Sequence, residues 1–235
     1  MPKAIRDAHA CCALYLIKNR FNGSAILHSI ELYVDELLRS DPTPTLQDRL
    51  SHAQALVLYH IICLLDGDIR ARVSAESQLI TLEESACALL PYVDFDNVAS
   101  KDEILPLYPI GPARAIWHDW ILHESARRAY LFSLYFIQAY GIVSGLQPPY
   151  CDSRLQLCRS LAVSTQLWNS RCAVTFAKAW NQRGFFIVTD CSFDALLRDG
   201  KAEDMDTFAK MLMSSAMGIE EAEGRFTMRG SSLRA

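Results

Sequence analysis

The sequence predicts an all-α protein, a multi-helix single domain with a long central aromatic helix. Apolar residues recur at helical spacing along most of the 235 residues, and strand-like alternation is scarce. Short connections rich in Asp, Gly and Pro separate the helical stretches, which favours antiparallel helical hairpins. We expect one domain over 1–235, with N-terminal helical hairpins over about 1–92 and the central helix and C-terminal helices over about 113–223.

The N-terminal part is predicted to hold four helices. Ser24 is the expected cap of the second. Thr45, with Asp48 three residues later, marks the start of the third at about Leu46. Pro91 is expected to end the fourth. The four expected helices run over Ala4–Lys18, from Ser24 to Asp41, from Leu46 to Gly67 and from Asp68 to Leu90.

The rest of the chain is predicted to be helical around two breaks. Prolines and glycines predict a loop over Tyr92–Pro112, and Gln147-Pro-Pro-Tyr150 is the second break. The central helix lies between them and is expected to close at Gly141 and Gly145. Phe185–Val188 is the single stretch expected to be extended, and the tail from Gly224 is expected to be exposed and frayed. Shorter helices are expected over Ala162–Arg183, Phe193–Arg198 and Asp204–Met217.

The central helix carries charge on its aromatic face. Glu124 and Arg128 stand four residues apart in the favourable orientation for an intrahelical ion pair, and Arg127 offers a second partner. Trp117 and Trp120 share that face, so the pair is expected to be buried and partnered. The spacing and the lack of a second carboxylate on the face favour a structural pair over a catalytic acid. The two tryptophans are interpreted as core, with a ligand cavity as the alternative.

These residues carry a resemblance to a known family. The run from Trp120 to Arg128, with the aromatic stretch after it, resembles the signature of the regulatory domain of fungal transcription factors, also called the middle homology region. That domain accompanies zinc binuclear-cluster and some two-Cys two-His finger modules. Leu167-Trp168-Asn169-Ser170 resembles the family's Leu-Trp-x-Ala segment, with Ser170 in place of alanine. The signature residues are Trp117, Trp120, Glu124, Arg127, Arg128 and Trp168.

The cysteines depart from that family. None of the eight stands in the Cys-x-x-Cys spacing of a binuclear cluster. The histidines lack metal-ligand spacing as well. We therefore expect neither a metal nor a cofactor, and the chain resembles the regulatory part without its DNA-binding module. The cysteines are Cys11, Cys12, Cys63, Cys87, Cys151, Cys158, Cys172 and Cys191.

Other candidate sites have simpler interpretations. Asp204 and Asp206, with Glu220 and Glu221, could bind magnesium as in a terpene-cyclase-like enzyme, but they stand where helix N-termini are expected, and the helix dipole alone accounts for them. The stretch from Gly141 to Gly145 has the wrong spacing for a nucleophile elbow and is interpreted as a helix end. One aromatic patch is interpreted as core, with an effector pocket as the alternative; it comprises Phe176, Trp180, Phe185 and Phe186 together with Trp168.

Composition narrows the function classes. A net charge of −4 and a pI near 5.9 argue against a stand-alone nucleic-acid binder. No secretory signal and no apolar run of about 20 residues is evident, so we expect an intracellular protein without a membrane span. The resemblance implies a nuclear, non-enzymatic regulatory module, with a secondary-metabolite gene cluster as one kind of target. It would act through protein partners such as the transcription machinery or another regulator, a small effector, or self-association. The alternatives are a helical enzyme of fungal secondary metabolism with a buried apolar pocket, and a non-functional truncated regulator.

Overall fold

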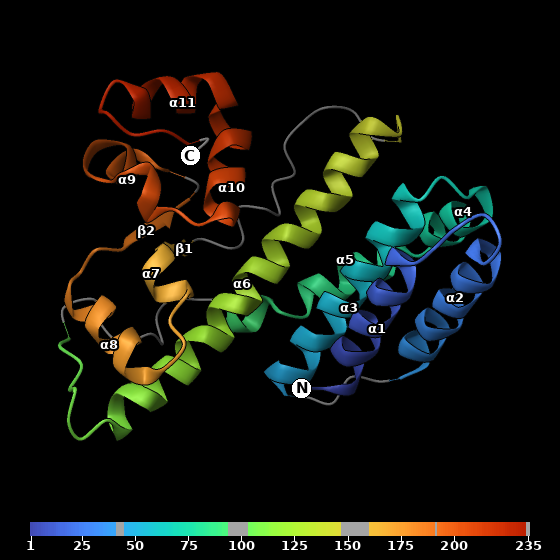
Figure 1. Ribbon diagram of the computed structural model, residues 1–235, viewed down its shortest axis with the longest axis horizontal. Coiled ribbons are helices and arrows are strands. Elements are labelled where there is room, and N and C mark those ends of the chain that lie inside the picture. Colours follow the sequence, from blue (N-terminus) through green and yellow to red (C-terminus); the bar gives the residue numbers. More distant parts are fainter. Residues whose placement is uncertain (41–44, 94–102, 147–159, 191, 234–235) are drawn as a thin grey trace. The chain divides into compact units, whose positions relative to one another are not determined.

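The computed structural model describes residues 1–40, 45–93, 103–146, 160–190 and 192–233. Within these ranges the chain is mostly helical, with one small two-stranded antiparallel sheet (Figure 1). The predicted all-α class is therefore confirmed. The chain divides into two compact units: Met1–Tyr92 with Ala129–Leu155, and Val93–Arg128 with Gln156–Ala235. The single domain over 1–235 stays a prediction.

The N-terminal unit is built around α3 (Figure 1). The helices α1, α2 and α3 contact one another, and α4 and α5 also contact α3. Buried residues occur on every turn of α3, including Leu50, Leu56 and Leu64, so this helix forms the centre of the unit's core. Its elements are α1 (Lys3–Leu16), α2 (Gly23–Arg39), α3 (Leu46–Leu65), α4 (Ile69–Ser77), α5 (Leu79–Cys87) and a short 3-10 turn (Leu90–Tyr92).

Helix ends in this unit follow the local capping chemistry. The hydroxyl of Thr45 accepts a hydrogen bond from the Asp48 backbone N–H at 3.3 Å, which confirms the predicted start of α3. The predicted Ser24 cap is wrong, because α2 begins at Gly23 and Asn22 occupies the N-cap position. The Asn22 side chain turns back instead, and its oxygen accepts from the Asn19 backbone N–H at 2.7 Å.

The helix predicted from Asp68 to Leu90 is two helices. Asp68 caps α4 by accepting from the Ala71 backbone N–H at 2.9 Å, and α4 ends at Ser77. Gln78, with φ −103° and ψ 2°, leaves the helical region, and α5 begins at the next residue. No Pro or Gly marks this break, so the sequence offered no breaker signal there.

The predicted central helix is α6 (Gly111–Val143), which has 33 residues. Residues up to Arg128 belong to the second unit, and residues from Ala129 onward belong to the first. Gly141 lies inside the helix, so the predicted closure at Gly141 is wrong. Closure at Gly145 is consistent with its φ of +75°, and the Ser144 hydroxyl donates to the Tyr140 carbonyl at 2.7 Å.

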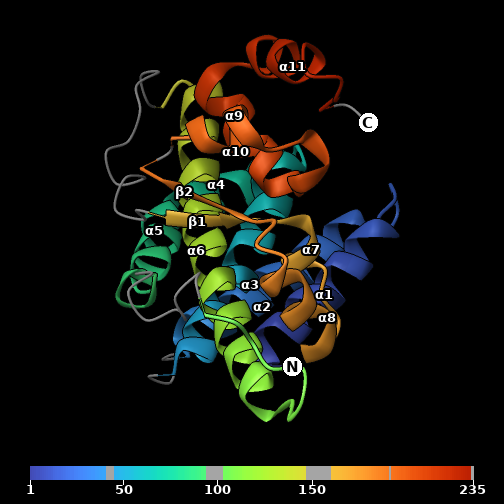
Figure 2. The ribbon, with the colours of Figure 1, turned by 90° about the vertical axis from the view of Figure 1, so that its left-hand side faces the viewer.

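The second unit contains a short ribbon of two strands among helices. Strands β1 (Ser160–Val163) and β2 (Phe186–Thr189) are antiparallel, with Ser160 opposite Thr189 and Val163 opposite Phe186. The ribbon lies between the pair α7 and α8 and the group α9, α10 and α11, as both views show (Figure 2). These helices are α7 (Thr165–Trp168), α8 (Ala173–Asn181), α9 (Asp194–Asp199), α10 (Thr207–Met217) and α11 (Ile219–Thr227), with a 3-10 turn at Ala202–Asp204.

Two predictions for this unit need correction. Ala162 lies in β1, not in a helix that reaches Arg183, because Ser164 and Cys172 start two separate helices, α7 and α8. The tail from Gly224 is largely exposed, as predicted, but it is not frayed: Phe226 is buried in α11, and the Ser231 hydroxyl accepts from the Ala202 backbone N–H at 3.0 Å. The extended Phe185–Val188 stretch is confirmed as β2, shifted by one residue. The expected helices at Phe193–Arg198 and Asp204–Met217 correspond to α9 and α10, while the expected break at 147–150 lies outside the described residues.

Candidate functional site

The predicted intrahelical ion pair is present and buried. The Glu124 side chain is fully enclosed, and its two oxygens lie 3.2 Å from Arg128 Nε and 3.3 Å from Arg127 Nη1. The two contacts follow from the spacing of these residues on α6, since positions three and four apart share a helix face. Both arginines therefore bind one carboxylate from the same side of the helix.

Arg127 also anchors the backbone before α6. Its Nε donates to the Val93 carbonyl at 2.8 Å, and its side chain is fully buried. Its spacing in the sequence predicted only a second pairing with Glu124. The structure gives it a second contact, because it connects α6 to a segment 34 residues earlier.

Arg128 joins three parts of the second unit. Its Nη2 donates to the Ala162 carbonyl of β1 at 3.2 Å and to Asp206 Oδ2 at 2.7 Å. Asp206 is also the N-cap of α10, where its other oxygen accepts from the Ala209 backbone N–H at 3.0 Å. We call Glu124, Arg127, Arg128 and Asp206 the arginine node.

The arginine node meets the second sequence motif. The Arg128 guanidinium lies over the indole of Trp168, at 4.0 Å from its ring centroid, and 5.3 Å from that of Phe208. A guanidinium at this distance from an indole face is held by a cation–π interaction. The motif around Trp120 to Arg128 and the motif around Leu167-Trp168 are therefore one site in space.

Charges in the arginine node balance. Burial raises the pKa of Glu124, and the two neighbouring guanidiniums oppose that effect. Two arginines face two carboxylates. In addition, the backbone N–H of Ala162 donates to Glu124 Oε2 at 3.5 Å. The polar atoms of the arginine node bind one another. A buried, fully hydrogen-bonded group of charges of this kind holds the segments that carry it in fixed positions.

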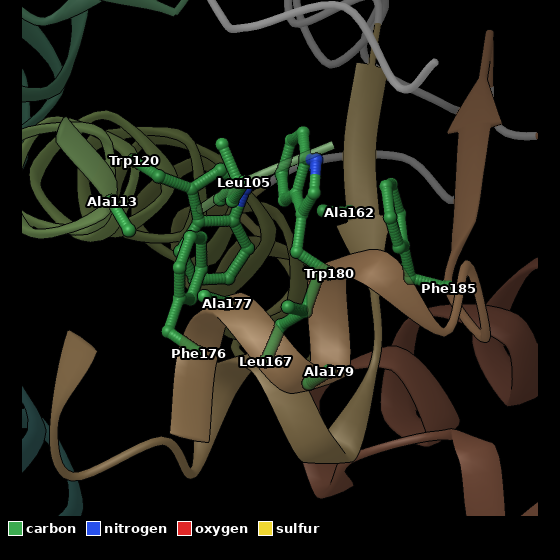
Figure 3. Close-up of a cluster of buried hydrophobic side chains, with 10 residues drawn as sticks. All are labelled: Leu105, Ala113, Trp120, Ala162, Leu167, Phe176, Ala177, Ala179, Trp180 and Phe185. Carbon is green, nitrogen blue, oxygen red and sulfur yellow. The ribbon is translucent and has the colours of Figure 1, made fainter. Parts of the chain in front are cut away.

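A second cluster of buried side chains in this unit is largely aromatic (Figure 3). Phe176 and Trp180 project from α8 toward Trp120 of α6, and the ring centroids are 5.3 Å apart for Trp120–Phe176 and 5.7 Å for Phe176–Trp180. Phe185 continues the stack at 5.0 Å from Trp180. Trp180 Nε1 donates to the Glu103 carbonyl at 3.0 Å, which also fixes the segment before α6.

The predicted effector pocket maps onto this cluster. Three of its members, Phe176, Trp180 and Phe185, are buried and contact one another, while Phe186 is half-buried in β2. Trp117 is half-buried and packs at the edge of the cluster. An effector pocket at these residues stays a prediction.

Sequence reasoning missed a cleft in the N-terminal unit. It has a volume of about 250 Å³ and lies among the start of α1, the second half of α2 and the start of α3. Asp7, Glu36 and Asp48 line it with Lys3, which pairs with Glu36. Its lining residues come from three helices, so no local motif in the sequence could have identified it.

The aspartates considered as magnesium ligands bind backbone N–H groups at turn and helix starts. Asp204 accepts from the Lys201 backbone N–H at 2.8 Å in the 3-10 turn, and Asp206 caps α10. Across the described ranges, no cluster of three His, Cys, Asp or Glu side chains has the arrangement of a metal site. None of the described helices combines the length and apolarity of a membrane-crossing segment.

The chain is a mostly helical protein with distant homology to a fungal transcription factor. It is 29% identical over 220 residues to "Transcription factor gsfR2" of Penicillium aethiopicum. The match covers 92% of this chain and 52% of that protein, so the chain spans about half the length of its relative. No family model and no solved structure matches the chain.

Proposed function

We propose that this chain is the regulatory module of a fungal transcription factor, that it works in the nucleus through protein partners, and that it does not itself read DNA bases. The observation that carries this proposal is the similarity to a transcription factor along 92% of the chain. The meeting of Arg128 with Trp168 supports it, because both motifs of the resemblance converge on one buried site.

The composition supports a regulatory role without direct reading of DNA bases. A net charge of −4 gives no general attraction to the phosphate backbone, which supplies most non-specific affinity for DNA. Base recognition would then come from a separate module, in the way the resemblance implies. A small effector, bound at the aromatic cluster, and control of a secondary-metabolite gene cluster belong to the same proposal.

A reporter assay tests the regulatory role. The chain is fused to a heterologous DNA-binding domain and expressed in a filamentous fungus that carries a reporter with the matching operator. We expect the fusion to change reporter output at least several-fold relative to the DNA-binding domain alone. Equal output at equal protein abundance in the nucleus would contradict the proposal. A fusion carrying Arg225→Ala, an exposed residue of α11, serves as the matched control for surface change.

Direct binding is measured separately. The isolated chain should show no preference for any DNA sequence, and any weak binding should vanish as salt is raised toward physiological concentration. Nanomolar binding to one sequence over scrambled competitor would show that this chain reads bases and would remove that part of the proposal.

A further inference from the structure

The break between α4 and α5 lies against a buried histidine. His60 of α3 is 2% exposed, and its Nδ1 lies 2.8 Å from the Leu56 carbonyl. A carbonyl can only accept, so Nδ1 carries the proton and donates. In the neutral ring the other nitrogen, Nε2, is then a lone-pair acceptor.

That acceptor has no hydrogen-bond partner among the described residues. Ala75 and Gln78, at the end of α4, line the same cavity as the imidazole, and their backbone carbonyls raise its pKa. Both already accept one hydrogen bond, from the backbone N–H groups of Gln78 and Leu82 respectively. While the ring is neutral, its Nε2 and the two carbonyls are all acceptors, and a group with two donors is needed to hydrogen-bond to both sides.

The space beside the ring fits a small donor. A cavity of about 20 Å³ is lined by His60, Ala75 and Gln78. This exceeds the roughly 10–15 Å³ that one water molecule needs, and it is too small for an organic ligand. Water has two O–H groups and suits a polar site that offers several acceptors.

We propose that one water molecule occupies this cavity, donating one hydrogen bond to His60 Nε2 and the other to the backbone carbonyl of Ala75 or Gln78. The water connects α3 to the break between α4 and α5 and satisfies the histidine that faces it. The break at Gln78 is thus held by a hydrated contact between helices.

Charge around the ring is consistent with a neutral imidazole. Burial lowers the pKa of His60, while backbone carbonyls oppose that effect. The titratable groups that line the same cavity are Glu31 and Asp35 of α2 and Tyr59 and Cys63 of α3. Glu31 and Asp35 have partners in His28 and Arg39, at 3.5 Å and 3.4 Å. At neutral pH the imidazole of His60 is expected to be neutral and to carry its proton on Nδ1.

Nuclear magnetic resonance of the full chain with ¹⁵N-labelled histidine tests this inference. At pH 7.5 we expect the His60 nitrogens to show the Nδ1–H tautomer and the ring to show a cross-relaxation signal with a long-lived water. An Nε2–H tautomer, or the absence of a bound water next to the ring, would overturn the proposal.

Two matched variants assign the signal. His60→Leu removes one of the acceptors, so the bound-water signal should disappear. His52→Leu changes another histidine of α3, which contacts Ser85 rather than this cavity, and the signal should remain. If His60→Leu does not fold, the tautomer and water signals of the unmodified chain still decide whether the proposed water is present. A water signal that persists in a folded His60→Leu chain would contradict the assigned site.

Discussion

Arg128 lies face-on to Trp168, with its guanidinium carbon 4.0 Å from the centre of the indole ring. The two residues belong to motifs on α6 and α7, and the sequence alone did not place them together. The contact joins the two motifs of the resemblance into one structural unit. It also makes Arg128 the residue on which most of the following expectations depend.

Truncation of Arg128 should destabilise the chain strongly. Arg128→Ala leaves Glu124 with Arg127 alone and leaves Asp206 without its guanidinium, both in buried surroundings. Breaking a buried pair by removing one partner costs about 3–5 kcal/mol. Urea midpoints of the wild type and the variant measure the loss.

A double variant provides the control for Arg128→Ala. Glu124→Gln combined with Arg128→Met removes two opposite charges at similar volume, so it should recover part of the lost stability. A loss below about 1 kcal/mol for Arg128→Ala would mean that the pair is screened by solvent in solution.

The indole face of Trp168 should contribute beyond its apolar area. Trp168→Leu removes the aromatic face over Arg128, and a desolvated cation–π contact is worth about 2 kcal/mol. Trp168→Phe keeps a weaker face and should lose less. A double-mutant cycle with Arg128→Met, which removes the cation, isolates the coupling between the two side chains, and additive effects of the two changes would exclude a direct interaction.

The two roles of Asp206 should separate by substitution. Asparagine is a good N-cap, so Asp206→Asn keeps the cap of α10 and weakens mainly the contact with Arg128. Asp206→Ala loses both, and the difference between the two variants should be about 0.5–2 kcal/mol, the usual value of a cap. Equal denaturation midpoints for the two variants would show that the cap contributes nothing measurable.

Stability should fall in acid through the contact between α1 and the end of α3. Burial acts to raise the pKa of Asp66, but hydrogen bonds from Lys18 and Tyr15 outweigh it, and the pKa lies below its ordinary 3.8. The Asp66 carboxylate therefore binds a proton more tightly in the unfolded chain than in the folded chain. The contribution of Asp66 is therefore complete above about pH 5 and is lost as pH falls through its lower folded pKa.

Asp66→Asn tests that pH dependence. The difference in free energy of unfolding between wild type and Asp66→Asn should be constant from about pH 5 to 7 and shrink below about pH 4. A difference that grows as the pH falls would show that the pKa of Asp66 is raised instead.

Capping chemistry was the most successful guide from sequence to structure. Thr45 with Asp48 gave the start of α3, and the helix-terminal interpretation of Asp206 corresponds to its position at α10. Both signals are local, because a side-chain oxygen binds a backbone N–H within three residues. The ion pair of Glu124 and Arg128 was predictable for the same reason, since its spacing is set by the helix itself.

Long-range contacts could not be predicted from the sequence. The apolar run Leu161-Ala162-Val163 fits a buried strand or a helix equally, and its pairing with β2 decided the matter. The break at Gln78 carries no breaker residue and lies against His60 of another helix. The partners of Arg128 in β1 and α10 lie 34 and 78 residues away, beyond the reach of any periodicity.

The separation of Arg128 from Asp206 has a consequence for the order of synthesis. After Arg128 is incorporated, 78 further residues must be translated before Asp206, its second carboxylate, exists. Chains synthesised at about 5–20 residues per second therefore expose an incompletely neutralised arginine and its aromatic neighbours for several seconds. We expect nascent chains stopped before Asp206 to depend on chaperones, and chains that extend through α10 to be released from them.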